Sequence, residues 1–200
     1  MINNKMTQFL SKITIFLCLT VSMMIFPLSD SHAQPQPEQL GEAVQEIESL
    51  DGMRSSLAST LEGTDETPNL ETFKEVCKPV GMRAKQLSQE KPWDVKQVAE
   101  KYRNPAHAPT PREAAALEKF ANNPDLFGFW ETTHDESYYY RRINVEASCL
   151  KCHGAKASRP DFVKQRYPED KAYDFEVGDL RGMYRVVLPE IKQQIQAALQ

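Results

Sequence analysis

Apolar residues recur every three or four positions along two stretches of the first half of the chain, which predicts two amphipathic helices. The first is expected from Leu40 to near Gly63, and its apolar positions are Leu40, Val44, Ile47, Leu50, Leu57 and Leu61. The second is expected to begin after Asn69, a suitable N-cap, and its apolar face comprises Leu70, Phe73, Cys77, Val80, Ala84 and Leu87. Pro79 and Gly81 interrupt this face, so we expect a kink or break just after Cys77.

A loop and a capped helix follow. The segment 103–109 contains two prolines, each of which biases the residue before it away from helix, so we expect a loop there. Thr110 then provides an N-cap, Pro111 suits the first helical position, and Glu113 completes a capping box. This helix is expected to stop by residues 122–124, Asn-Asn-Pro.

The pattern then changes to aromatic and β-branched residues, which favours strands. The ranges 126–133 and 137–145 predict a hairpin, joined by the polar turn 134–136, and the tyrosines at 138–140 are expected to alternate between the two faces of the sheet. A further strand is expected from Leu180 to Leu188, and a short helix from Glu190 to Leu199. Helices followed by an antiparallel sheet indicate an α+β domain.

The N-terminus is typical of an export signal. Lys5 and Lys12 precede an apolar run at 13–28, and Ser31-His32-Ala33 places small residues where a signal peptidase cleaves. A retained membrane anchor is the alternative, but Pro27 within the run and the small-residue site favour cleavage. We therefore expect a signal peptide at 1–33, a linker and helix at 34–68 and the main folded domain at 69–200. The mature protein would then be periplasmic or secreted, with no stable membrane span.

Composition excludes one class of partner. The chain of 200 residues is 40% hydrophobic and 26% charged, and its formal net charge is -4. This is the composition of a soluble globular protein. No basic stripe could follow a phosphate backbone, so we expect no nucleic acid partner.

The haem prediction comes from Cys149-Leu150-Lys151-Cys152-His153, a C-x-x-C-H motif. Two thiols at this spacing can each bond to one vinyl group of a single porphyrin, and the histidine that follows can bind the iron. The motif predicts one covalent haem c, held by Cys149 and Cys152, with His153 as the proximal iron ligand.

Three other interpretations of the motif fit less well. A thioredoxin-like redox pair would follow a strand in a βαβ unit, which the pattern does not show. A zinc site would need more cysteines or histidines at ligand spacing. A disulfide between Cys149 and Cys152 would close a tight, strained loop and leave His153 without a role.

The second axial position of the iron stays open at this point. The candidates are Cys77, His107, His134, Met82, Met183, or no protein ligand. Cys77 has the best case, because it is the third cysteine of the mature chain and lies on an apolar helix face. A thiolate is a proper iron ligand. The alternative is that Cys77 is a small buried apolar residue. The sequence alone favours neither of these two interpretations over the other.

Three arginines are candidates for pairing with haem propionates, because a guanidinium matches a carboxylate in geometry. They are Arg103, Arg141 and Arg142. The alternative for each is a solvated surface charge.

Several motifs in order resemble the Tll-type family of periplasmic single-haem domains, from about Glu71 to Pro189. They are Glu75-Val76-Cys77, the loop 103–109, the C-x-x-C-H motif with Gly154, the stretch 167–172 and the stretch 177–182. The resemblance implies a PAS-like antiparallel sheet flanked by helices, and a haem with His153 as the proximal and Cys77 as the distal ligand. The sequence departs from the family pattern at His107, where a second asparagine is expected, and at Pro79 and Gly81.

These expectations favour low-potential electron transfer or redox sensing, because a thiolate stabilises Fe(III) and two axial ligands leave no open iron position. A redox partner protein, or an output protein for a sensor, is then required. The alternative is an open iron position, in a haem enzyme such as a peroxidase or a sulfur-compound oxidoreductase, or in a gas-binding protein.

Overall fold

The computed structural model describes residues 37–189. The expected signal peptide and the closing helix at 190–199 lie outside this range. Among the described residues, no helix is both long and apolar enough to cross a membrane.

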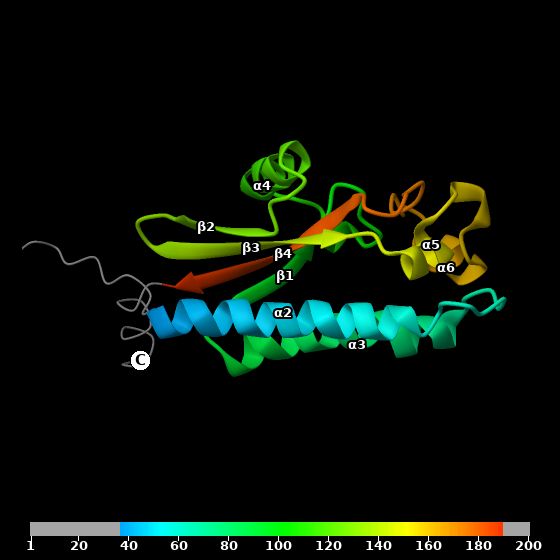
Figure 1. Cartoon of the computed structure of the whole chain (residues 1–200), viewed down its shortest axis with the longest axis horizontal. Helices are drawn as coiled ribbons and strands as arrows, with labels where there is room; N and C mark the ends of the chain where they lie inside the picture. The colour runs from blue at the N-terminus through cyan, green and yellow to red at the C-terminus, as the bar shows by residue number, and fades with distance from the viewer. Residues whose placement is uncertain (1–36, 190–200) are drawn as a thin grey trace, which may run out of the picture. The chain divides into compact units, whose positions relative to one another are not determined.

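Two long helices, α2 (Pro37–Ser59) and α3 (Leu70–Glu90), pack side by side on one face of the sheet (Figure 1). Asn69 caps α3 as expected, because its side-chain oxygen accepts hydrogen bonds from the backbone N–H groups of Glu71 and Thr72 at 2.8 and 3.2 Å. Both predicted helices are present, and α2 ends four residues before Gly63.

The expected break after Cys77 is wrong, because α3 is continuous through Pro79. A proline inside a helix costs about 3 kcal/mol. The same helix buries Val76, Val80, Ala84 and Leu87 against the core, and each buried apolar side chain of this kind contributes on the order of 1–3 kcal/mol. Packing on both sides of Pro79 therefore outweighs the local cost.

The sheet has four antiparallel strands in the order β1-β4-β3-β2. The strands are β1 (Asp94–Val98), β2 (Gly128–Thr132), β3 (Glu136–Asn144) and β4 (Leu180–Pro189). The predicted hairpin is β2–β3, and the predicted third strand is β4, so the α+β class and the antiparallel sheet are confirmed. Strand β1 was not predicted, because its buried positions Val95 and Val98 lie three residues apart and do not alternate.

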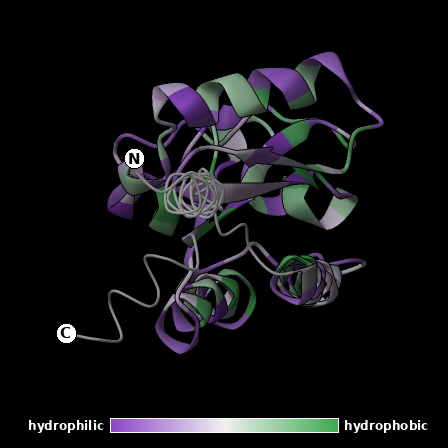
Figure 2. Ribbon diagram, turned by 90° about the vertical axis from the view of Figure 1, so that its left-hand side faces the viewer, coloured by the Kyte–Doolittle hydropathy of each residue, from purple (hydrophilic) through white to green (hydrophobic). Residues whose placement is uncertain are grey.

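Helices cover both faces of this sheet, as Figure 2 shows in a view along α2 and α3. One core lies between α2, α3 and the sheet, and includes Ile47, Leu87, Trp93, Tyr139 and Tyr184. The other lies under α4 (Pro111–Asn122), and includes Leu117, Phe120, Tyr140 and Met183. Tyr139 and Tyr140 therefore lie on opposite faces, as predicted.

The N-terminus of α4 has the predicted capping box. Thr110 Oγ1 accepts from the Glu113 backbone N–H at 3.3 Å, and the Glu113 carboxylate accepts from the Thr110 N–H at 2.8 Å. The same buried carboxylate accepts from Arg185 on β4 at 3.0 Å. One carboxylate therefore caps the helix and ties it to the sheet.

The connection from β3 to β4 folds at one end of the sheet, beyond the ends of the strands (Figure 1). It contains α5 (Leu150–His153), α6 (Asp161–Arg166) and the 3-10 turns Ala147–Cys149 and Lys156–Ser158. A small core of Val145, Ala172 and Phe175 supports it, with Cys149 and Leu150 packed against that core. This connection carries the C-x-x-C-H motif.

Gly182 lies near the start of β4, at a position that only glycine fits without strain. Its φ is 155°, and a Cβ at this position would lie 2.4 Å from the carbonyl oxygen of Val98. The pairing of β3 with β4 also shifts register here, between Ile143 and Asn144. Glycine thus allows β4 to approach β1 closely at the point where the sheet meets the connection.

We expect Gly182→Ala to lower the free energy of unfolding by roughly 1–3 kcal/mol, because both the backbone conformation and the close approach exclude a Cβ. Gly52→Ala is the control, since Gly52 lies in the middle of α2 and a Cβ there meets no atom within 4 Å. That substitution should raise stability by about 0.5–1 kcal/mol. Urea unfolding measures both, and equal effects of the two alanines would contradict the role of Gly182.

Candidate functional site

A cavity of about 430 Å³ lies at this end of the sheet. Its walls come from α3, the end of α2, the segment after β1 and the α5 connection. Apolar side chains predominate in the lining, and they include Ala58, Leu61, Phe73, Val76, Val80, Val98 and Ile143. A mostly apolar pocket with a few polar groups suits a cofactor.

All four predicted haem residues line this cavity. Cys149 directly precedes α5, Cys152 and His153 lie within it, and Cys77 arrives from α3. The three cysteines of the described chain are free. Cys77 is solvent-accessible because it faces the open cavity, although protein atoms surround it closely enough that burial raises the pKa of its thiol. The structure thus unites residues that are 72 positions apart in the chain.

A backbone hydrogen bond fixes the orientation of His153. Its Nδ1 lies 2.8 Å from the carbonyl oxygen of Ala172. A carbonyl only accepts, so Nδ1 carries the proton and the lone pair of the ring lies on Nε2. Burial and the charges of Arg181 and Arg103 hold the pKa of His153 well below 6.5. The ring is therefore neutral at pH 7, with Nε2 available as a metal ligand.

Burial makes two thiols of the cavity, Cys77 and Cys152, weaker acids than a free cysteine. Burial raises the pKa of Cys152 to about 11, although the positive charge of Arg103 opposes the shift. Burial raises that of Cys77 as well, against the opposing charges of Arg103 and Arg181. Both thiols are therefore protonated at neutral pH, and a bound metal cation would be needed to make Cys77 a thiolate.

Arg103 ties the motif to the loop after β1. Its Nη2 donates to the carbonyl oxygen of Cys152 at 2.8 Å, and its Nε donates to Asp170 at 3.3 Å. Arg103 also lines the cavity. The other two candidates for propionate pairing do not: Arg141 pairs with Glu48, and Arg142 is buried with Nη1 donating to the carbonyl of Phe120.

The remaining ligand candidates separate into two groups. His107 and Met82 line the cavity with Cys77. His134 lies in the exposed turn between β2 and β3, where it contacts Asp135. Met183 is fully buried under α4, on the other face of the sheet. Neither His134 nor Met183 is near enough to line the cavity.

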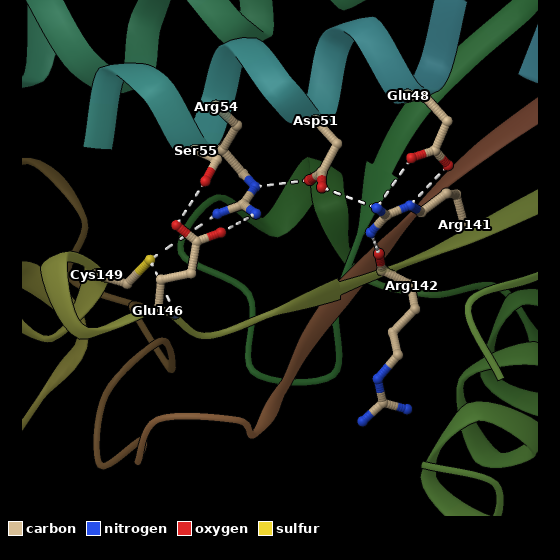
Figure 3. A network of polar contacts seen from close by, with 8 residues as sticks. All are labelled: Glu48, Asp51, Arg54, Ser55, Arg141, Arg142, Glu146 and Cys149. Atoms are coloured by element: carbon tan, nitrogen blue, oxygen red, sulfur yellow. Dashed lines mark hydrogen bonds and ion pairs between the residues drawn. The ribbon is translucent and has the colours of Figure 1, made fainter. Parts of the chain in front are cut away.

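A polar network that the sequence did not predict joins α2 to the motif (Figure 3). Arg54 donates to Asp51 at 2.8 Å and to Glu146 at 2.7 Å, and its Nη1 lies 4.0 Å from Cys149 Sγ. Ser55 donates to the second oxygen of Glu146 at 2.8 Å. Glu146 therefore holds the residues before Cys149 against α2. No short-range pattern signals this contact, because its partners are more than 90 residues apart.

The donor set fits a c-type haem. Two thiols at the required spacing, an imidazole with a free Nε2 and a third thiol from another wall surround one apolar cavity. Among the described residues, no cluster of three or more His, Cys, Asp and Glu side chains is arranged to hold a bare metal ion. The thiols and the imidazole suit a haem iron, because the porphyrin itself supplies the equatorial ligands.

Comparison with known proteins gives a consistent result. Residues 32–189 match the profile of the Tll0287-like family. A solved structure, described as the crystal structure of the cyanobacterial heme-protein Tll0287, is 56% identical to this chain. The match covers 78% of this chain and 98% of that one, with a TM-score of 0.73. No curated protein sequence matches the chain.

We expect Glu146→Gln to lower the free energy of unfolding by about 1 kcal/mol at pH 7, because it weakens two charge-assisted contacts. Burial opposes ionisation of Glu146, but hydrogen bonds from Ser55 and Arg54 lower its pKa below the ordinary 4.5. A depressed folded pKa stabilises the native state above about pH 4.5, and this contribution is lost as the pH falls further. The difference between wild type and variant should therefore shrink below pH 4.5.

Chemical denaturation at pH 7 and at lower pH measures this effect. Glu71→Gln is the control, since Glu71 forms an exposed pair with Lys74, and such pairs contribute little. A deficit of Glu146→Gln that stays constant across the acid range would show that the carboxylate charge is not what holds the motif to α2.

Proposed function

The chain belongs to the Tll0287-like family, and on that premise we propose that it is an exported haem protein with one covalent haem c and His/Cys axial ligation. The observation that carries the proposal is the convergence of Cys77, Cys149, Cys152 and His153 on one apolar cavity. The likeness to a solved heme-protein at 56% identity supports the haem. When bound, the haem supplies a one-electron Fe(III)/Fe(II) couple.

Each cavity residue has a distinct task in this proposal. Cys149 and Cys152 form thioether bonds, and the contacts of Glu146 and Arg103 hold the backbone on either side of them. His153 binds iron through Nε2, because Nδ1–H is committed to Ala172. Cys77 binds as the thiolate, from a helix that the core holds rigidly through Val76 and Val80.

This ligand pair favours electron transfer or redox sensing at low potential. A thiolate places negative charge at the metal and stabilises the ferric state, so the midpoint potential lies below that of His/Met cytochromes. With both axial positions filled by protein, no position is open to a substrate. A redox partner protein, or an output protein that responds to the haem, completes the proposal. The signal-like N-terminus supports a location in the periplasm or outside the cell.

Covalent attachment has a direct test. Acid-acetone extraction of the purified protein should leave the colour with the polypeptide, because thioether bonds survive acid. Cys149→Ala and Cys152→Ala should each leave haem bound by a single thioether or lost. Haem that partitions fully into the solvent from wild type would contradict a c-type attachment.

The thiolate has its own test in Cys77→Ser. The haem should stay attached while the midpoint potential rises, because the variant removes an anionic ligand. His107→Ala is the matched control, since His107 also lines the cavity but has no ligand role in the proposal. Redox titration of the wild type and the two variants measures the midpoint potentials and so tests which residue is the distal ligand. If Cys77→Ser keeps the wild-type potential and His107→Ala does not, the distal ligand is His107.

The absorption and EPR spectra of the ferric wild-type protein test whether the sixth iron position is filled. A high-spin spectrum would show that this position is open, and would favour a haem enzyme or a gas-binding protein.

A further inference from the structure

Arg181 is a cationic residue of the cavity that the proposed function does not use. It lines the cavity together with Cys77, Cys149 and His153. Strand alternation would place it on the same face as Met183, under α4. The glycine conformation at Gly182 and the register shift opposite it redirect the backbone. The guanidinium of Arg181 can therefore line the cavity, although the regular strand pattern would direct it toward α4.

The charge of Arg181 has no direct counter-charge. Within the described part of the chain its guanidinium forms no ion pair, and Nη1 donates only to the neutral carbonyl of Lys101, at 3.1 Å. Burial and the neighbouring charge of Arg103 lower its pKa to about 10, so it is still cationic at pH 7. The half-buried guanidinium of Arg181 lines a mostly apolar cavity without an ion pair, so its charge is available to a group that binds there.

Asp170, whose charge acts on Arg181, is already paired with two other arginines. Asp170 is fully buried and pairs with Arg103 at 3.3 Å and with Arg159 at 3.0 Å. Arg103 and Arg159 thus share the single negative charge of Asp170, and Arg181 forms no ion pair with it.

We infer that Arg181 supplies positive charge at the haem cavity and raises the midpoint potential above the value that thiolate ligation alone would set. The inference rests on the proposed function and deepens it. Ferric haem carries one more positive charge than ferrous haem, so a nearby cation disfavours the ferric state. Arg181 is a positioning residue in this role: it acts through its field and binds no iron.

The experiment is a redox titration of the haem-bearing Arg181→Gln, Arg181→Lys and Arg166→Gln proteins against wild type. Arg181→Gln should lower the equilibrium constant for reduction about tenfold, which is about 59 mV for a one-electron couple. Arg181→Lys keeps the charge and should stay close to wild type. Arg166 is exposed at the end of α6 and does not line the cavity, so Arg166→Gln should leave the potential unchanged.

Three results would overturn the inference. The first is an unchanged potential in Arg181→Gln. The second is an equal fall in Arg181→Lys, because shape rather than charge would then matter. The third is a fall accompanied by an altered ferric absorption spectrum, because a change of ligand would explain it. Wild-type protein that loses its haem in acid-acetone would instead contradict the proposed function.

Discussion

One buried carboxylate, Asp170, holds the haem motif to the rest of the domain. Its side chain is completely buried and accepts hydrogen bonds from Arg103, Arg159 and the backbone N–H of Ala172. Arg103 in turn donates to the carbonyl of Cys152, and Ala172 accepts from His153. A buried charge is tolerated only when it is paired and hydrogen-bonded. The orientation of the proposed proximal ligand therefore depends on Asp170 being satisfied.

This constraint matters because the motif lies outside the regular structure. Helix α5 has only four residues, and the connection around it extends past the end of the sheet (Figure 1). Asp170 fixes it on one side, and the Arg54–Glu146 network fixes it to α2 on the other. Cys77 needs no such support, because α3 is anchored by its buried residues Val76, Val80, Ala84 and Leu87. The cavity is thus formed between a rigid helix and a segment held by charges.

Local chemistry predicted most of the elements. The capping groups at Asn69 and Thr110 and the composition of the β2–β3 hairpin are encoded within a few residues, and each is present as predicted. Strand β1 and the continuity of α3 through Pro79 could not be read in this way, because both depend on long-range packing. The stretch 167–172, which supported the family resemblance, contains Asp170 and Ala172, but its role becomes clear only from their contacts.

The site was predictable to a similar extent. Spacing alone predicted Cys149, Cys152 and His153 as haem residues, and the structure places them in one cavity with Cys77. Arg54, Glu146 and Arg181 were missed, because their relevance arises only where segments distant in the sequence meet. Of the three arginines proposed as propionate partners, the structure places one in the cavity, since strand alternation and ion pairs direct Arg141 and Arg142 elsewhere.

The central claim is that Cys77 and His153 both bind the iron. X-ray absorption spectroscopy at the iron edge of the ferric wild-type protein measures its first coordination shell directly. The account predicts one sulfur and five nitrogen neighbours, with the sulfur absent in Cys77→Ser. A first shell without sulfur in the wild type, or a sulfur that persists in Cys77→Ser, would contradict it.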